Sequence, residues 1–197
     1  MGKRPALTAC GGAMLGFAET IKSQVTQSLL MAMLENAGYL VSRLGVEERL
    51  AEVKYLSKPE YDRLALPQQL RLLPDLLVAA PDLSAAHLVE VKYRRQLEPR
   101  TIRQLVERLG QQFEVWPGTV VVLFQSDSLW DDRGFIQDHV RAIRQQDLSM
   151  LGDERRPIED RWCTLPMLHQ ALPGLKSDNY LTRSDGVAPM LMALGYL

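Results

Sequence analysis

Apolar residues recur at helical spacing in two long stretches of the chain. The first stretch covers residues 14–37 and is followed by Gly38, at a position where helices commonly end. The second follows Leu97-Glu98-Pro99, and its apolar residues recur at i, i+3, i+4, i+7 and i+11. The stripes are Phe17, Ile21, Val25, Leu29 and Met33 in the first helix and Ile102, Leu105, Val106, Leu109 and Phe113 in the second.

Shorter apolar runs predict strands at 39–44, 72–80, 87–93 and 119–125. The run at 119–125, T-V-V-V-L-F-Q, is apolar on both faces, as expected for a central strand covered on both sides. The segment Pro81-Asp82-Leu83-Ser84 has the composition of a turn, so the second and third runs form a hairpin. The succession of strand 87–93, the second amphipathic helix and strand 119–125 indicates a strand–helix–strand unit, and hence an α/β fold.

Further elements are predicted around this centre. A capping box at Ser57 starts a short helix, and another helix opens at Trp130 with Val140 and Ile143 facing inward. Residues 148–160 form a charged loop, residues 161–165 a last strand, and residues 166–172 a short helix. The expected organisation is a flexible N-terminus at 1–13, a single domain at 14–172 and a C-terminal tail at 173–197.

The composition of the chain excludes some classes of function. The 197 residues carry a net charge of −1, which argues against a protein that coats nucleic acid non-specifically but allows a local basic groove. Two cysteines make a disulfide framework implausible and suit a cytoplasmic location. No apolar run approaches the roughly 20 residues that cross a membrane. We therefore expect a cytoplasmic protein with no membrane partner.

Three charged residues interrupt the apolar strands of the hairpin. Asp75 lies in the first strand, and Glu90 and Lys92 lie in the second. Since side chains alternate along a strand, Glu90 and Lys92 project from the same face, and an antiparallel partner strand brings Asp75 beside them. Charges in an apolar setting are costly unless they pair or hold a metal. These residues are therefore candidates for a functional site.

Here the chain resembles the PD-(D/E)XK nuclease superfamily. Pro74-Asp75 corresponds to the PD element and Glu90-Val91-Lys92 to the (D/E)XK element, with 14 residues between Asp75 and Glu90. Two similar stretches fit less well, because Glu52-Val53-Lys54 has no Pro-Asp before it and Pro81-Asp82 belongs to the turn. The resemblance implies a restriction-endonuclease-like αβββαβ core, a central mixed sheet flanked by helices.

The resemblance also implies an activity and its residues. Asp75, Glu90 and the Val91 carbonyl would hold Mg²⁺ or Mn²⁺, and Lys92 would position or help deprotonate a water. Glu19, on the first helix, stands where the family often places a further carboxylate, although Glu19 also suits the positive end of the helix dipole. Gln27, two turns further along on roughly the same face, could fill a similar place. The substrate would be a phosphodiester in DNA more than in RNA, in repair, recombination, restriction or defence against mobile elements.

Basic residues gather after the Glu90 strand. Between residues 92 and 108 there are six basic side chains and two acidic ones, which suits a nucleic-acid groove but also an ordinary solvated helix face. Many family members place a glutamine on this helix near the site, and Gln104 is the candidate here. The predicted nucleic-acid-binding residues are Arg94, Arg95, Arg100, Arg103, Gln104 and Arg108.

Two other interpretations remain open. The chain has the near-neutral charge and the apolar ending of a catalytically silent subunit with the same fold, acting as an interaction or assembly module. Such a subunit would form a homodimer or a larger protein complex through the C-terminal tail. In the other interpretation, an unrelated α/β domain carries the motif by coincidence, and Asp75 and Glu90 then lie far apart.

Overall fold

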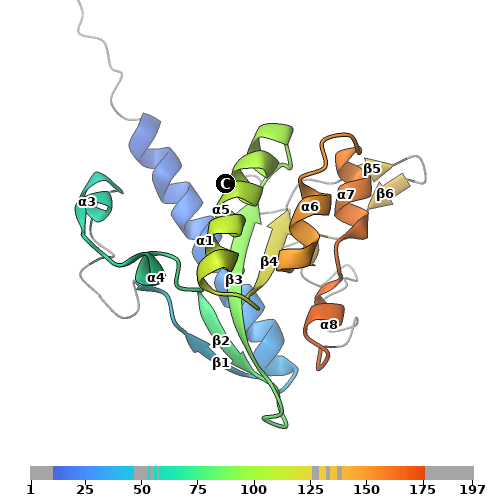
Figure 1. Ribbon diagram of the computed structural model, residues 1–197, viewed down its shortest axis with the longest axis horizontal. Coiled ribbons are helices and arrows are strands. Elements are labelled where there is room, and N and C mark those ends of the chain that lie inside the picture. The colour runs from blue at the N-terminus through green and yellow to red at the C-terminus, as the bar shows by residue number, and fades with distance from the viewer. Residues whose placement is uncertain are drawn as a thin grey trace, which may run out of the picture.

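The computed structural model describes residues 11–46, 53, 56, 58–125, 129–131, 134–136 and 139–175 (Figure 1). The side chains of residues 11–20 and 129–136 are outside this description. The strands are β1 (Leu40–Arg43), β2 (Leu76–Ala79), β3 (Ala86–Arg94), β4 (Val120–Gln125), β5 (Leu129–Asp131), β6 (Gly134–Ile136) and β7 (Val140–Ile143). The helices are α1 (Gly11–Asn36), α3 (Lys58–Arg63), α4 (Gln68–Arg71), α5 (Pro99–Val115), the 3₁₀ helix η2 (Gln145–Asp147), α6 (Leu148–Leu151), α7 (Ile158–Thr164) and α8 (Leu168–Ala171).

Five strands form a mixed sheet in the order β1-β2-β3-β4-β7. The β1–β2, β2–β3 and β4–β7 pairs are antiparallel, whereas β3 and β4 are parallel and are connected through α5. The predicted hairpin, the strand–helix–strand unit and the mixed α/β architecture are therefore confirmed. At the hairpin tip, the Ser84 amide donates to the Asp82 carboxylate at 3.0 Å, so the second Pro-Asp of the chain does belong to a turn.

Helices cover both faces of this sheet (Figure 1). One buried cluster combines α1 and α8 with residues such as Val89, Val91 and Val122. The other combines α5, α6 and α7 with Val121, Leu123 and Ile143. Every residue of β4 is buried, and the apolar stripe of α5 supplies Ile102, Leu105, Leu109 and Phe113 to the second cluster. Among the helices that the structure describes, none is long and apolar enough to cross a membrane.

Two predicted elements are wrong. The helix predicted from Trp130 is replaced by the β5–β6 pair and by β7, whose V-R-A-I residues are all buried against β4. A short apolar run of this kind fits strand or helix equally well by its periodicity, and pairing with β4 decides the outcome. The predicted strand at 161–165 is helix α7, where Pro157 precedes the first turn and Glu159 and Asp160 lie in it, an arrangement that favours a helix N-terminus.

The remaining predictions are close to the structure. The short helix predicted from Ser57 is α3, and the helix predicted at 166–172 is α8. The predicted loop at 148–160 contains α6 and the start of α7. This segment is helical and not a solvated loop because Leu151 and Trp162 are fully buried in the hydrophobic cluster that contains the apolar residues of α5.

Candidate active site

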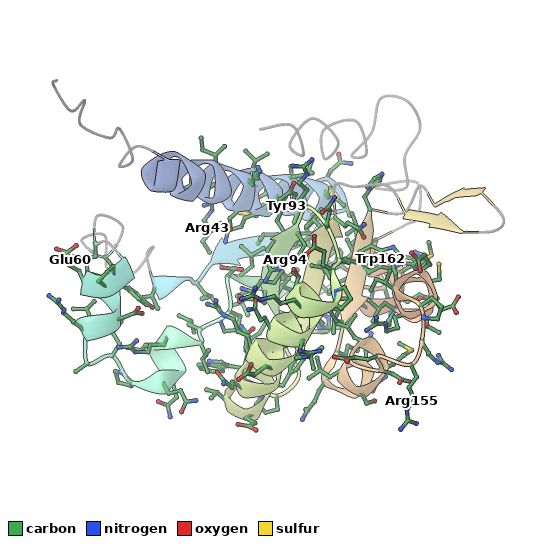
Figure 2. All side chains as sticks on the ribbon, turned by 90° about the horizontal axis from the view of Figure 1, so that it is seen from above. Arg43, Glu60, Tyr93, Arg94, Arg155 and Trp162 are labelled. Atoms are coloured by element: carbon green, nitrogen blue, oxygen red, sulfur yellow. The ribbon has the colours of Figure 1, made fainter. Side chains whose placement is uncertain are left out.

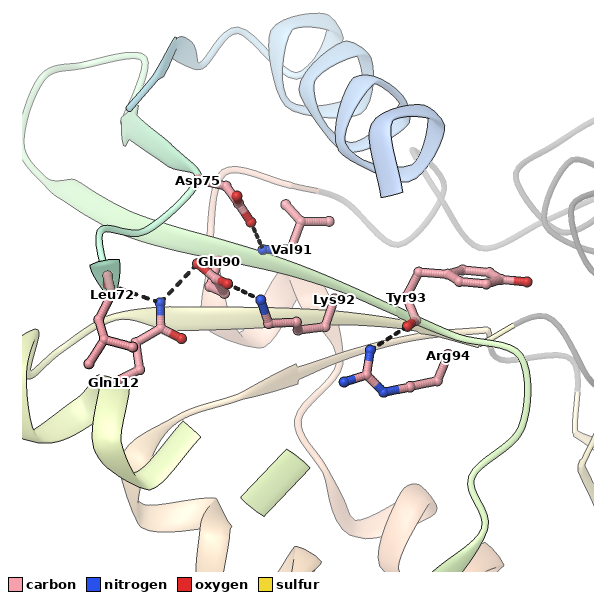
Figure 3. A network of polar contacts seen from close by, with 8 residues as sticks. All are labelled: Leu72, Asp75, Glu90, Val91, Lys92, Tyr93, Arg94 and Gln112. Atoms are coloured by element: carbon pink, nitrogen blue, oxygen red, sulfur yellow. Dashed lines mark hydrogen bonds and ion pairs between the residues drawn. The ribbon is translucent and has the colours of Figure 1, made fainter. Parts of the chain in front are cut away.

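Asp75 is fixed at the point where the β2–β3 ladder ends. Its main-chain carbonyl accepts a hydrogen bond from the amide of Leu44, at the end of β1, at 2.8 Å. Its carboxylate Oδ2 accepts a hydrogen bond from the amide of Val91 in β3 at 2.7 Å (Figure 3). Pro74 cannot donate a ladder hydrogen bond, so strand pairing stops here. Asp75 is thus held on both sides, by β1 through its backbone and by β3 through its side chain.

Glu90 and Lys92 form an ion pair on β3. The ammonium of Lys92 donates to Glu90 Oε1, and the side chains of Lys92 and Glu90 are 17% and 8% exposed. The face they share is opposite to that of Val89 and Val91, which belong to the α1 cluster. A buried ion pair of this kind depends on further hydrogen bonds to offset the loss of hydration.

Gln112 supplies that further hydrogen bond. Its amide nitrogen donates to Glu90 Oε2 at 2.8 Å and lies 3.5 Å from the carbonyl oxygen of Leu72 (Figure 3). The residue is 3% exposed and lies on the buried stripe of α5, next to Phe113. Sequence reasoning missed Gln112, although a glutamine three positions after Leu109 on an apolar stripe was a usable signal. Gln104, the predicted glutamine of this helix, is exposed on α5.

The Asp75 carboxylate therefore meets β3 at the middle residue of Glu90-Val91-Lys92 (Figure 3). A residue's N–H and C=O point to the same side of a strand, so the Val91 carbonyl also points toward the edge where Asp75 lies. The Asp75 carboxylate thus lies next to Val91, whose carbonyl is another of the predicted ligands. Val91 directly follows Glu90, the third predicted ligand, on β3. Among the described side chains, no group of three or more His, Cys, Asp or Glu residues lies close enough together to hold a metal ion.

Glu19 and Gln27 are the two candidate site residues of α1. Glu19 lies within the helix, but its side chain is outside the described part of the structure. Gln27 accepts a hydrogen bond from Arg43 of β1 at 3.3 Å. Two described residues of α1 do approach the end of β3: Lys22, whose ammonium lies 6.0 Å from the centre of the Tyr93 ring, and Ser23.

The predicted nucleic-acid-binding residues separate into two groups. Arg94 and Arg108 line one small pocket together with Lys92. Arg95, Arg100, Arg103 and Gln104 are exposed and outside that pocket. Arg103 also pairs with Glu154, with nitrogen–oxygen distances of 3.0 and 2.8 Å. The structure thus brings two of the six residues next to the Glu90–Lys92 pair.

We expect Gln112→Leu to lower the free energy of unfolding by about 1–3 kcal/mol, because it leaves a buried oxygen of Glu90 without its donor. Urea denaturation followed by circular dichroism measures this change. The matched control is Gln111→Leu, at an exposed position of the same helix, where a change within about 0.5 kcal/mol is expected. Equal losses in the two variants would show that the Gln112–Glu90 hydrogen bond contributes nothing specific.

No family model matches the chain, and comparison with curated proteins and with solved structures found no significant similarity. The assignment of a function therefore depends on the residues and the geometry described above.

Proposed function

We propose that this protein is a metal-dependent nuclease that hydrolyses phosphodiester bonds, in DNA more than in RNA. The observation that carries the proposal is the 2.7 Å hydrogen bond between the Asp75 carboxylate and the Val91 amide. Two elements that are separate in the sequence, Pro74-Asp75 and Glu90-Val91-Lys92, meet through this contact. The antiparallel pairing of β2 with β3 sets the two elements side by side, and the contact is made by the Asp75 carboxylate itself.

The order of the elements supports the same proposal. Apart from the short helices α3 and α4 in the connection between β1 and β2, the succession α1, β1, β2, β3, α5, β4 has the order of the αβββαβ core of PD-(D/E)XK nucleases. In this restriction-endonuclease-like interpretation, the acidic residues are Asp75, directly before β2, and Glu90 on β3, and α5 carries the basic face beside them. The fold leaves the end of β3 beyond Val89 without β2 as a neighbour, so a substrate would approach there.

The donor set suits a hard divalent cation. The Asp75 and Glu90 carboxylates and the Val91 carbonyl are all oxygen donors, and Mg²⁺ or Mn²⁺ binds such groups while keeping several waters. An ionised carboxylate has about four acceptor positions, so it can accept hydrogen bonds and bind a cation at the same time. When bound, the metal would lower the pKa of a water and stabilise charge on the phosphodiester.

The protein's own residues would act around this centre. Asp75 and Glu90 would hold the cation, and the hydrogen bond from Gln112 would keep the Glu90 carboxylate oriented. The Lys92 ammonium would donate a hydrogen bond to the attacking water or to a phosphate oxygen. The exposed basic residues of α5 would hold the nucleic-acid backbone without reading its sequence.

The test is a cleavage assay on labelled linear, branched and single-stranded DNA, and on RNA, with Mg²⁺, Mn²⁺ or EDTA. We expect cleavage with either metal, none in EDTA, and faster cleavage of DNA than of RNA. The preferred DNA structure would define the substrate class. If correctly folded protein cuts none of these substrates, the stand-alone nuclease proposal is wrong.

One observation favours a catalytically silent subunit instead. Both oxygens of Glu90 are already engaged, one by Lys92 and one by Gln112, as in an ion pair that serves only the fold. A silent subunit would fold normally, cleave nothing, and act through a homodimer or protein complex. The proposed contact involves the tail at 173–197, of which residues 176–197 lie outside the described part of the chain.

A further inference from the structure

A small pocket lies beside the candidate active site, at the end of β3. Its volume is about 180 Å³. Figure 2 shows Tyr93 on the side of α1 and Arg94 on the side of α5, so the pocket lies between these two helices. Its lining residues are Ser23, Val91, Lys92, Tyr93, Arg94 and Arg108.

The lining is cationic. Lys92, Arg94 and Arg108 carry positive charge, Ser23 adds a hydroxyl, and none of the lining residues that the structure describes is acidic. Glu90 pairs with Lys92, and the two arginines add two further positive charges to the lining. Arg94 Nη1 donates to the carbonyl oxygen of its neighbour Tyr93 at 2.6 Å, which holds the guanidinium at the end of β3.

The size of the pocket limits the ligand. A volume of about 180 Å³ is below the roughly 300–1,000 Å³ of sites that bind drug-sized molecules. A whole nucleotide is therefore too large, whereas a tetrahedral anion with its waters fits. Paired arginines with a hydroxyl are suited to phosphate, because guanidinium groups bind phosphate oxygens through two parallel hydrogen bonds.

We propose that this pocket binds a single phosphate group of a nucleic acid, next to the phosphate that is cleaved. The inference deepens the proposed nuclease function and rests on it. Lys92 connects the pocket with the candidate active site, since it lines the pocket and also pairs with Glu90. A phosphate held by Arg94, Arg108 and Ser23 fixes the position of the nucleic-acid backbone relative to Asp75 and Glu90. These three residues are positioning residues and take no part in the chemistry.

The pocket's ligand comes from one of two sources. It is an internal phosphodiester of a continuous strand or a terminal phosphate at a strand end. The first source suits an endonuclease and the second an enzyme that starts from an end. Both kinds of phosphate present the same oxygens to the arginines. The experiment therefore has one arm that tests for phosphate binding and a second arm that distinguishes internal from terminal phosphates.

The first arm titrates isotope-labelled full-length protein with inorganic phosphate in EDTA and follows amide resonances by NMR. We expect saturable shifts at residues 91–94 and Ser23 in the wild type. Arg108→Ala should weaken this binding by about tenfold or more, the scale of one charge-assisted contact. Ser23→Ala should weaken it in the same direction. Arg155→Ala, at an exposed arginine far from the pocket, is the matched control and should bind as wild type (Figure 2).

The second arm measures, also in EDTA, the binding of short DNA with a terminal phosphate or a terminal hydroxyl. Tighter binding of phosphorylated ends, lost in Arg108→Ala, identifies a terminal phosphate. Equal binding of both DNAs, weakened in Arg108→Ala, identifies an internal phosphodiester. If Arg108→Ala and Ser23→Ala bind phosphate and both DNAs as wild type does, the pocket is not a phosphate site.

Neither arm depends on cleavage, so the two proposals fail separately. Phosphate binding at the pocket without cleavage of any substrate would overturn the nuclease function alone. If Arg108→Ala keeps wild-type metal-dependent cleavage, and phosphate causes no resonance shifts at residues 91–94 of the wild type, the proposed phosphate site alone is wrong.

Discussion

Asp75→Asn is expected to reduce metal-dependent cleavage by about a thousandfold or more, equivalent to roughly 4 kcal/mol of activation free energy. Asparagine keeps an oxygen that accepts the Val91 hydrogen bond, so the local structure should persist. It lacks the negative charge that a divalent cation requires. Initial cleavage rates with Mg²⁺ measure the effect, and thermal unfolding checks that the variant is folded.

The chain provides a matched control in its other Pro-Asp sequence. Asp82 is exposed at the hairpin tip, where it accepts hydrogen bonds from Ser84, and Asp82→Asn changes the same charge away from the site. We expect wild-type cleavage in this variant. If the Asp75 variant cleaves as fast as wild type, or the Asp82 variant loses as much, then Asp75 does not hold the metal.

Lys92→Met is expected to lower the free energy of unfolding by about 3 kcal/mol and to abolish cleavage. The substitution keeps a long apolar side chain but leaves the charge of Glu90, which is 6% exposed, without its cation. Removing one partner of a buried ion pair costs about 3–5 kcal/mol, because the other charge remains buried. Chemical denaturation and the cleavage assay measure the two effects on the same protein.

The double variant Glu90→Gln with Lys92→Met separates the structural role from the catalytic one. With both charges gone, stability should return to within about 1 kcal/mol of wild type, since neutral replacements of a buried pair are well tolerated. Cleavage should stay absent, because a metal ligand and the lysine are both missing. A double variant that regains stability and also cleaves would rule out Glu90 and Lys92 as catalytic residues.

The parts of the fold that could be predicted are those with strong local patterns. The stripes of α1 and α5 repeat over several turns, and β4 is an unbroken β-branched run, so each has one favourable conformation. The segment around β5–β7 lacks such a pattern. Val140 and Ile143 are three positions apart, as on a helix, and their place in a strand depends on β4, far away in sequence. Pairing partners of this kind are not visible in a local window.

The candidate site shows the same limit. Asp75, Glu90 and Lys92 could be selected because charge in an apolar strand is unusual. Gln112 was not selected, since its importance depends on which face of α5 meets β3. Once the stripe of Leu105, Leu109 and Phe113 is placed against the sheet, Gln112 is the polar residue that reaches Glu90. Sequence patterns identified the charged pair, and tertiary packing identified its partner.

Strand β4 has a consequence for how the molecule unfolds. Its residues alternate between the two buried clusters, with Val122 and Phe124 on the α1 side and Val121 and Leu123 on the α5 side. Loss of either helical layer would expose half of the same strand to water. The two cores are therefore thermodynamically coupled, and partial opening that releases only one layer is disfavoured. The neighbouring strand β3, which carries Glu90 and Lys92, pairs with β4, so opening at the candidate site requires disruption of both cores.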